Sequence, residues 1–135
     1  MPKKLFFDDI SKQGLPFYGG NVSYKFKYTG EGEKTLQIQR FSGTAISVDV
    51  DGKRISGMLA FPPNRLEIGT LDKGVHDISI TLYGNRMNTF GQLHNTILKP
   101  SYTDPGMWRP RGRFYTPEYM LRNYGIYTTP VFLSK

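Results

Sequence analysis

The stretch VHDISITLY, residues 75–83, decides the fold class of this protein. Alternate residues of this stretch share one side of an extended chain, which carries His76, Ile78, Ile80 and Leu82. Alternation with a period of two over this length is typical of a half-buried β-strand. Because His76 falls on the inward side of that strand, we interpret it as a hydrogen-bonded structural histidine and not as a catalytic one.

The same alternation predicts further strands on both sides of this stretch, over residues 21–29, 34–40, 46–50, 55–59 and 65–68. Residues 119–123 and 126–133 are predicted as closing strands, with a short strand near residues 90–94. Predicted turns lie at residues 30–32, 51–52 and 73–74. The Asp51-Gly52 pair gives the strongest turn signal, because a type I′ hairpin turn needs positive φ at both central positions. Pro62-Pro63 marks a sheet edge or a crossing between sheets.

Composition also favours β-structure in one domain. The 135 residues include 2 alanines, 25 valines, isoleucines and threonines together, and 19 aromatic residues. No segment shows a sustained helical period, and about eight short strands in one domain fit a jelly roll. The sequence therefore predicts an all-β fold, a single antiparallel β-sandwich of jelly-roll type over residues 1–135.

The charge balance raises the question of an anionic partner, because the net charge is +7 and the isoelectric point is about 9.7. Arginines alternate with aromatic residues between Trp108 and Tyr115, a mixture that can hold single-stranded nucleic acid. Elsewhere lysines alternate outward along strands, and no nucleic-acid-binding signature is present, so this partner is not favoured. No apolar run approaches the ~20 residues that cross a bilayer, and no membrane partner is expected. Cysteine is absent, which excludes disulfides, and the compartment stays open.

Recognisable catalytic and metal-binding patterns are also absent from the sequence, which contains no nucleophile elbow, zinc motif or phosphate loop. The four glutamates are Glu31, Glu33, Glu67 and Glu118, and none forms an evident pair of the kind that glycosidases use. Carboxylates are dispersed along the chain, so we predict no catalytic residue, no metal and no cofactor. A structural calcium ion stays an open alternative.

The long segment of residues 84–117 breaks the strand pattern and gathers aromatic, amide and guanidinium groups. Sugars present a flat C–H face and a ring of hydroxyls, which an aromatic platform and planar hydrogen-bonding groups can meet. We therefore predict ligand binding by Asn85, Arg86, His94, Asn95, Trp108, Arg109 and Arg113. Trp108 would stack on the sugar ring, and Arg86 and Arg113 would each donate two hydrogen bonds to it. Asn85, His94 and Asn95 would orient the ligand through further hydrogen bonds.

A structural alternative accounts for the same residues without any ligand. In it Trp108 closes one end of the sandwich, and the arginines pair with Asp104 or Glu118. Asn85, Arg86 and His94 would bond to the backbone and hold the long loop together. Side-chain chemistry alone favours this alternative, because a lone tryptophan is more often part of a core.

A family resemblance bears on the choice. One part of the chain resembles the sugar-binding β-sandwich of family-two-like glycoside hydrolases. The resemblance lies in DGK at residues 51–53, in PPNRLEIG at residues 62–69, and in the glycine, histidine and isoleucines that follow. Residues 15–21, 84–95 and 108–126 are similar to galactose-binding-like jelly-roll accessory domains of bacterial glycoside hydrolases.

The resemblance implies a non-catalytic, C-terminal accessory domain excised from a larger bacterial glycoside hydrolase. Its partners would be carbohydrate and the catalytic domain of the parent chain, which would carry the catalytic carboxylates. Such domains either bind carbohydrate or only brace the catalytic domain, and the shared fold does not decide between these roles.

Overall fold

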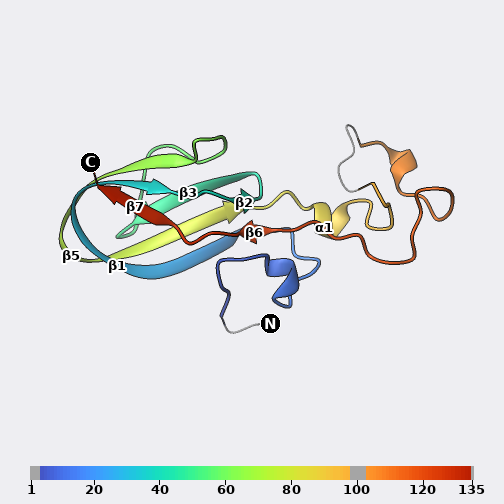
Figure 1. Ribbon diagram of the computed structural model, residues 1–135, viewed down its shortest axis with the longest axis horizontal. Helices are drawn as coiled ribbons and strands as arrows, with labels where there is room; N and C mark the ends of the chain where they lie inside the picture. Colours follow the sequence, from blue (N-terminus) through green and yellow to red (C-terminus); the bar gives the residue numbers. More distant parts are fainter. Residues whose placement is uncertain (1–3, 98–102, 135) are drawn as a thin grey trace.

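The computed structural model describes residues 4–97 and 103–134 (Figure 1). The strands in this part are β1 (Val22–Gln37), β2 (Phe41–Ser42), β3 (Ala45–Val50), β4 (Lys53–Arg54), β5 (Arg65–Tyr83), β6 (Gly125–Ile126) and β7 (Val131–Ser134). Helix is limited there to α1 (Met87–Phe90) and to two 3-10 turns, Ile10–Lys12 and Pro105–Met107. The prediction of an all-β antiparallel fold is confirmed.

A long antiparallel pair, β1 and β5, forms the centre of the main sheet, whose strand order is β4-β3-β5-β1-β7. The pairing runs from Val22 opposite Leu82 to Gln37 opposite Arg65. Strands β2 and β6 form a separate two-stranded sheet. Because strands distant in sequence pair directly, the fold depends on contacts that local preferences alone do not specify.

The core lies on one face of the main sheet. The inward side chains of β5 confirm the predicted alternation, since Ile78, Ile80 and Leu82 are almost fully buried while their neighbours are partly exposed. Ile10 and Ile126, from the N-terminal segment and β6, belong to the same cluster and cover that face. Burying each such side chain contributes roughly 1.5–3 kcal/mol of transfer free energy. The N-terminal segment and β6 therefore form a second, smaller layer of the sandwich over the main sheet.

The predicted turn at Asp51-Gly52 is confirmed. Asp51 has a φ of 48° and Gly52 a φ of 79°, the left-handed values that a type I′ turn requires. Lys53 then pairs with Val50, so β4 folds back on β3.

The predicted turns at residues 30–32 and 73–74 are wrong, because β1 and β5 run through them without interruption. Gly30 lies directly opposite Gly74, and the register shifts between Gly30 and Gly32. A bulge of this kind takes up an extra residue and bends a strand without ending it. The glycines therefore mark an irregularity within a strand pair and not a reversal of the chain.

The predicted strands at residues 90–94 and 119–123 are also wrong. Part of the first segment is α1, and the second forms no strand. Close to these segments, an isolated β-bridge joins Asn95 to Tyr115. Seven strands are found in the described residues, and the jelly-roll arrangement stays a prediction.

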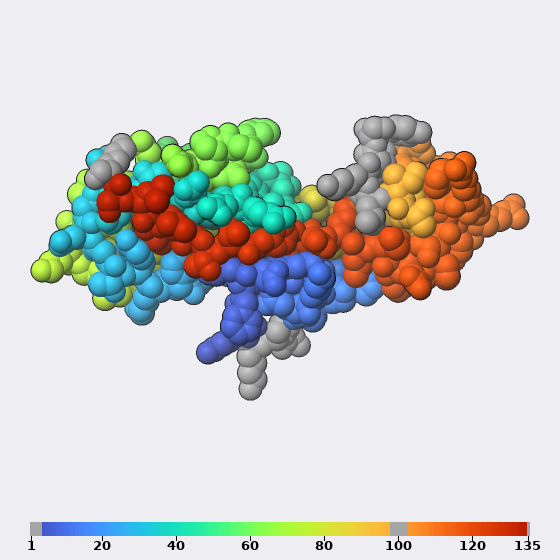
Figure 2. All heavy atoms as spheres, in the orientation of Figure 1, coloured from blue at the N-terminus to red at the C-terminus, as the bar shows by residue number. Residues whose placement is uncertain are grey.

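Residues 84–97 and 103–123, here called the distal loop region, extend beyond the ends of β2 and β6 (Figure 1). In the space-filling view this region forms one end of an elongated molecule (Figure 2). Within residues 4–97 and 103–134, no helix is long and apolar enough to cross a membrane.

Candidate functional site

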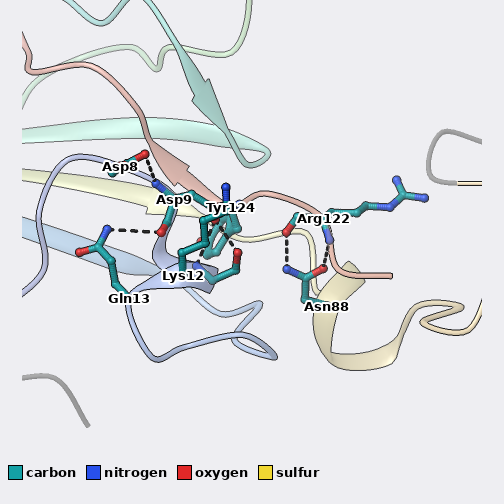
Figure 3. A network of polar contacts seen from close by, with 8 residues as sticks. Asp8, Asp9, Lys12, Gln13, Asn88, Arg122 and Tyr124 are labelled. Carbon is teal, nitrogen blue, oxygen red and sulfur yellow. Dashed lines mark hydrogen bonds and ion pairs between the residues drawn. The ribbon is translucent and has the colours of Figure 1, made fainter. Parts of the chain in front are cut away.

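The two stretches of the distal loop region are joined to each other by a buried amide. Asn88, on α1, is only 3% exposed, and its Nδ2 donates to the carbonyl oxygen of Arg122 at 2.6 Å. The Arg122 backbone N–H donates in return to Oδ1 of Asn88 at 2.8 Å. Figure 3 shows Asn88 reaching from α1 to the Arg122 backbone. One side chain thereby makes the paired bonds that a neighbouring strand would have made.

A second amide supports the interior of the region. Asn95 is 5% exposed, and its Nδ2 donates to the carbonyl oxygen of Met107 at 3.4 Å. Its Oδ1 accepts from the Ile97 backbone N–H at 2.9 Å. Asn95 was predicted to orient a ligand, but these bonds place it in the scaffold that holds the 3-10 turn Pro105–Met107.

A groove of about 580 Å³ lies beside this scaffold. Ligand sites in proteins commonly measure about 300–1,000 Å³, so the groove is large enough for one or a few sugar rings. Three of its aromatic side chains are open to solvent, since Trp108 is 50% exposed, Tyr119 58% and Tyr115 37%. Polar lining comes from Gln92, His94 and Arg109, and further apolar lining from Leu93, Met107 and Pro110.

His94 is held in a defined orientation in this groove. Its Nδ1 lies 3.0 Å from the carbonyl oxygen of Thr116, and its ring centre lies 4.8 Å from that of Tyr119. A carbonyl oxygen only accepts hydrogen bonds, so Nδ1 carries the proton. In the neutral ring Nε2 is then the acceptor, which can receive a hydroxyl proton from a ligand.

Arg109 is also oriented by its own loop. Its Nε–H donates to the carbonyl oxygen of Gly106. The two terminal nitrogens of the guanidinium form no hydrogen bond or ion pair with the described residues, and they remain able to bind a ligand in parallel.

The seven predicted site residues do not all meet at this groove. His94, Trp108 and Arg109 line it. Arg86 lines a different hollow, where α1 meets the N-terminal segment, and the side chain of its neighbour Asn85 accepts from the Met87 backbone N–H at 3.1 Å. Arg113 lies outside the groove lining, with its guanidinium carbon 5.5 Å from the centre of the Phe114 ring.

The structural alternative for the arginines is not observed. No arginine of the distal loop region forms an ion pair with Asp104 or Glu118 in the described chain. Trp108 does not close the sandwich either, because half of its surface is exposed and it lines the groove.

Sequence reasoning did not select Gln92, Tyr115 or Tyr119 for the site. The sequence pattern puts Tyr119 on a predicted strand and Tyr115 beside the arginines. The available signal was the density of aromatic residues between Trp108 and Tyr119. Which of them face one hollow depends on Asn95 and its partners, which no local pattern specifies.

The groove offers no carboxylate among its described lining residues. In residues 4–97 and 103–134, no three histidine, aspartate or glutamate side chains gather closely enough to hold a metal ion. The described lining side chains offer aromatic faces and hydrogen-bonding groups.

No protein-family model and no curated protein sequence matches this chain. Among solved structures, a rhamnosidase from Novosphingobium sp. PP1Y is similar to it, with 21% identity over 93% of this chain and a TM-score of 0.65. A GH2 beta-galacturonidase from Eisenbergiella tayi, bound to galacturonate, has 22% identity over 64% of this chain and a TM-score of 0.49, too low to establish a shared fold. The chain spans only 12% of the rhamnosidase and 15% of the galacturonidase. This β-sandwich fold therefore recurs as a small part of a glycoside hydrolase.

Proposed function

We propose that this chain is a non-catalytic accessory module of a larger glycoside hydrolase and that it binds carbohydrate in the distal groove. The observation that carries the proposal is the exposure of Trp108, Tyr115 and Tyr119 around a hollow that also contains oriented polar groups. The likeness to a segment of a rhamnosidase supports the glycosidase context. The galactose-binding-like classification and a catalytic domain in the same polypeptide belong to this proposal.

Binding would use the two faces of a sugar ring differently. The apolar C–H face would stack on Trp108, whose half-exposed ring loses unfavourable contact with water when it is covered. The hydroxyl groups would meet His94 Nε2 and the terminal nitrogens of Arg109. Asn95 would act from behind the groove by holding the loop, and Asn85, Arg86 and Arg113 would lie outside the ligand contact.

The test compares two exposed aromatic residues. Trp108→Ala should abolish glycan binding on an oligosaccharide array and in calorimetry, while the melting temperature changes little. Phe61→Ala is the matched control, because Phe61 is 82% exposed and does not line the groove. The proposal fails if no glycan binds the parent protein, or if Trp108→Ala leaves binding intact.

A structural brace is the second candidate, and the junction of the distal loop region with the sandwich favours it. Phe17 and Tyr119 pack edge to face there, with ring centres 4.9 Å apart, yet they remain 44% and 58% exposed. Phe90, at 69% exposure, lines a hollow together with Phe17. Neighbouring exposed aromatics of this kind are typical of surfaces that a second domain covers. A brace predicts that Phe90→Ser leaves this domain's melting temperature unchanged but loosens its complex with a catalytic domain supplied in trans.

A further inference from the structure

We propose that the distal groove selects acidic carbohydrate, with Arg109 binding the carboxylate of a uronic-acid residue. This inference rests on the proposed function, because it specifies the ligand class of the same groove. It is carried by the charge of the groove and by the way in which the Arg109 side chain is held.

The charge around the groove is one-sided. The described parts of the distal loop region contain five arginines but only two carboxylates, Asp104 and Glu118, and neither of these lines the groove. None of the five arginines forms an ion pair in the described chain. A neutral sugar gains nothing from this excess of positive charge, whereas an acidic sugar is attracted by it.

Arg109 has the geometry that carboxylate recognition requires. The bond from Nε to the Gly106 carbonyl ties the exposed guanidinium to its own loop. The terminal nitrogens then present parallel N–H donors, which match the two oxygens of a carboxylate. A side chain that is already restrained by such a bond loses less entropy when a ligand binds.

The aromatic residues indicate that the ligand has a ring in addition to its carboxylate. Trp108, Tyr115 and Tyr119 provide flat surfaces for a pyranose ring on the same groove as Arg109. A small metabolite that carries only a carboxylate would leave them uncovered.

Single-stranded nucleic acid fits the observations less well. Its binding grooves track successive phosphates with several cations along their length. Here one arginine lines the groove, and Arg111 and Arg113 lie outside its lining. One carboxylate per bound sugar matches this arrangement better than a continuous phosphate chain does.

The experiment uses three probes by calorimetry at moderate salt: trigalacturonate, the same trisaccharide with its carboxylates reduced to hydroxymethyl groups, and a short oligothymidylate. Each is titrated into the parent protein and into Arg109→Gln and Arg65→Gln. Arg65→Gln removes the same charge from an exposed position on β5, away from the groove, and controls for net charge.

We expect trigalacturonate to bind at least about tenfold more tightly than the reduced trisaccharide, as a charge-assisted bidentate contact would give. Arg109→Gln should remove this preference by weakening the binding of trigalacturonate more than that of the reduced trisaccharide, whereas Arg65→Gln should keep the preference. If the two trisaccharides bind equally well and Trp108→Ala abolishes the binding of both, the acidic specificity is overturned and the proposed function stands. Tighter Arg109-dependent binding of oligothymidylate would also overturn it. Binding of no probe, together with an empty glycan array, would remove the proposed function and this inference with it.

Discussion

Nδ1 of His76 lies 2.7 Å from Oδ2 of Asp51 and joins β5 to the turn between β3 and β4. Nε2 of the same ring lies 2.8 Å from the carbonyl oxygen of Asp72. Both acceptors need an N–H group, so the arrangement is best satisfied by the doubly protonated imidazolium. Asp51 is fixed in turn, because its Oδ1 accepts from the Asp77 backbone N–H at 2.8 Å.

The first prediction concerns the pH dependence of stability. The hydrogen bond to Asp51, and then the one to the Asp72 carbonyl, raises the pKa of His76 above its ordinary value, and the same contact with His76 lowers the pKa of Asp51. A raised histidine pKa gives stability that is complete below about pH 6.5 and is lost as the pH rises through the folded-state value. A lowered aspartate pKa gives stability that is present above about pH 3.9 and is lost as the pH falls through the folded-state value.

The pair should therefore stabilise the fold most between about pH 4 and pH 6.5. Melting temperatures measured from pH 4 to pH 9 by calorimetry should decline on the alkaline side for the parent protein. In His76→Gln this decline should be smaller and the melting temperature at acidic pH lower. Parallel pH profiles for the two proteins would show that His76 is not charged in the folded state.

The position of His76 also shows what sequence reasoning could predict. Its inward parity followed from the strict alternation of residues 75–83, a pattern that burial of one sheet face imposes on a strand. The Asp51-Gly52 turn followed from a backbone requirement that few residue pairs meet. Both features are local, and both were found in the structure.

The features that were missed are not local. Gly30 and Gly74 each look like the centre of a turn, and they become part of one strand pair only because they face each other. The segment of residues 119–123 has the composition of a strand, but its backbone at Arg122 bonds to the side chain of Asn88 and not to a neighbouring strand. The groove combines Trp108 and Tyr119 with His94 through such long-range contacts. Residue types alone therefore did not show which side chains line this groove.

The second prediction concerns the junction of the N-terminal segment with the C-terminal part of the chain. Oδ1 of buried Asp9 accepts from the backbone N–H groups of Ser11 and Tyr124, each at 3.1 Å, and from the Ser11 hydroxyl at 2.7 Å (Figure 3). Asp9→Ala leaves the buried Tyr124 N–H without a partner and should lower the free energy of unfolding by roughly 2–3 kcal/mol. Asp77→Ala is the control, since its ion pair with Lys27 is exposed on both sides. Equal losses in urea titrations of the two variants would contradict the role of Asp9.

The third prediction concerns the contact that joins the two stretches of the distal loop region. Asn88→Ala removes both hydrogen bonds to the Arg122 backbone and leaves those groups without their partner. Hydrogen exchange should accelerate at Arg122 and in α1, while β5 keeps its protection, because the main sheet does not depend on this contact. Asn123→Ala, at an exposed neighbouring position, should leave exchange unchanged. Uniform acceleration across β1 and β5 would show instead that the region and the sandwich unfold as one unit.

The last prediction is that this chain by itself hydrolyses no glycoside. Glycosidases place two carboxyl groups about 5–5.5 Å apart for retention, or about 6.5–9.5 Å apart for inversion, across the scissile bond. The described lining of the distal groove has no carboxylate, and Glu118 in the same region lies outside that lining. Aryl glycosides incubated for hours with micromolar protein should release no phenol above the blank. Turnover that copurifies with the protein and disappears in Glu118→Gln or Glu67→Gln would instead establish an active site in this chain. In that case the groove would have to be assigned to substrate positioning for catalysis and not to accessory binding.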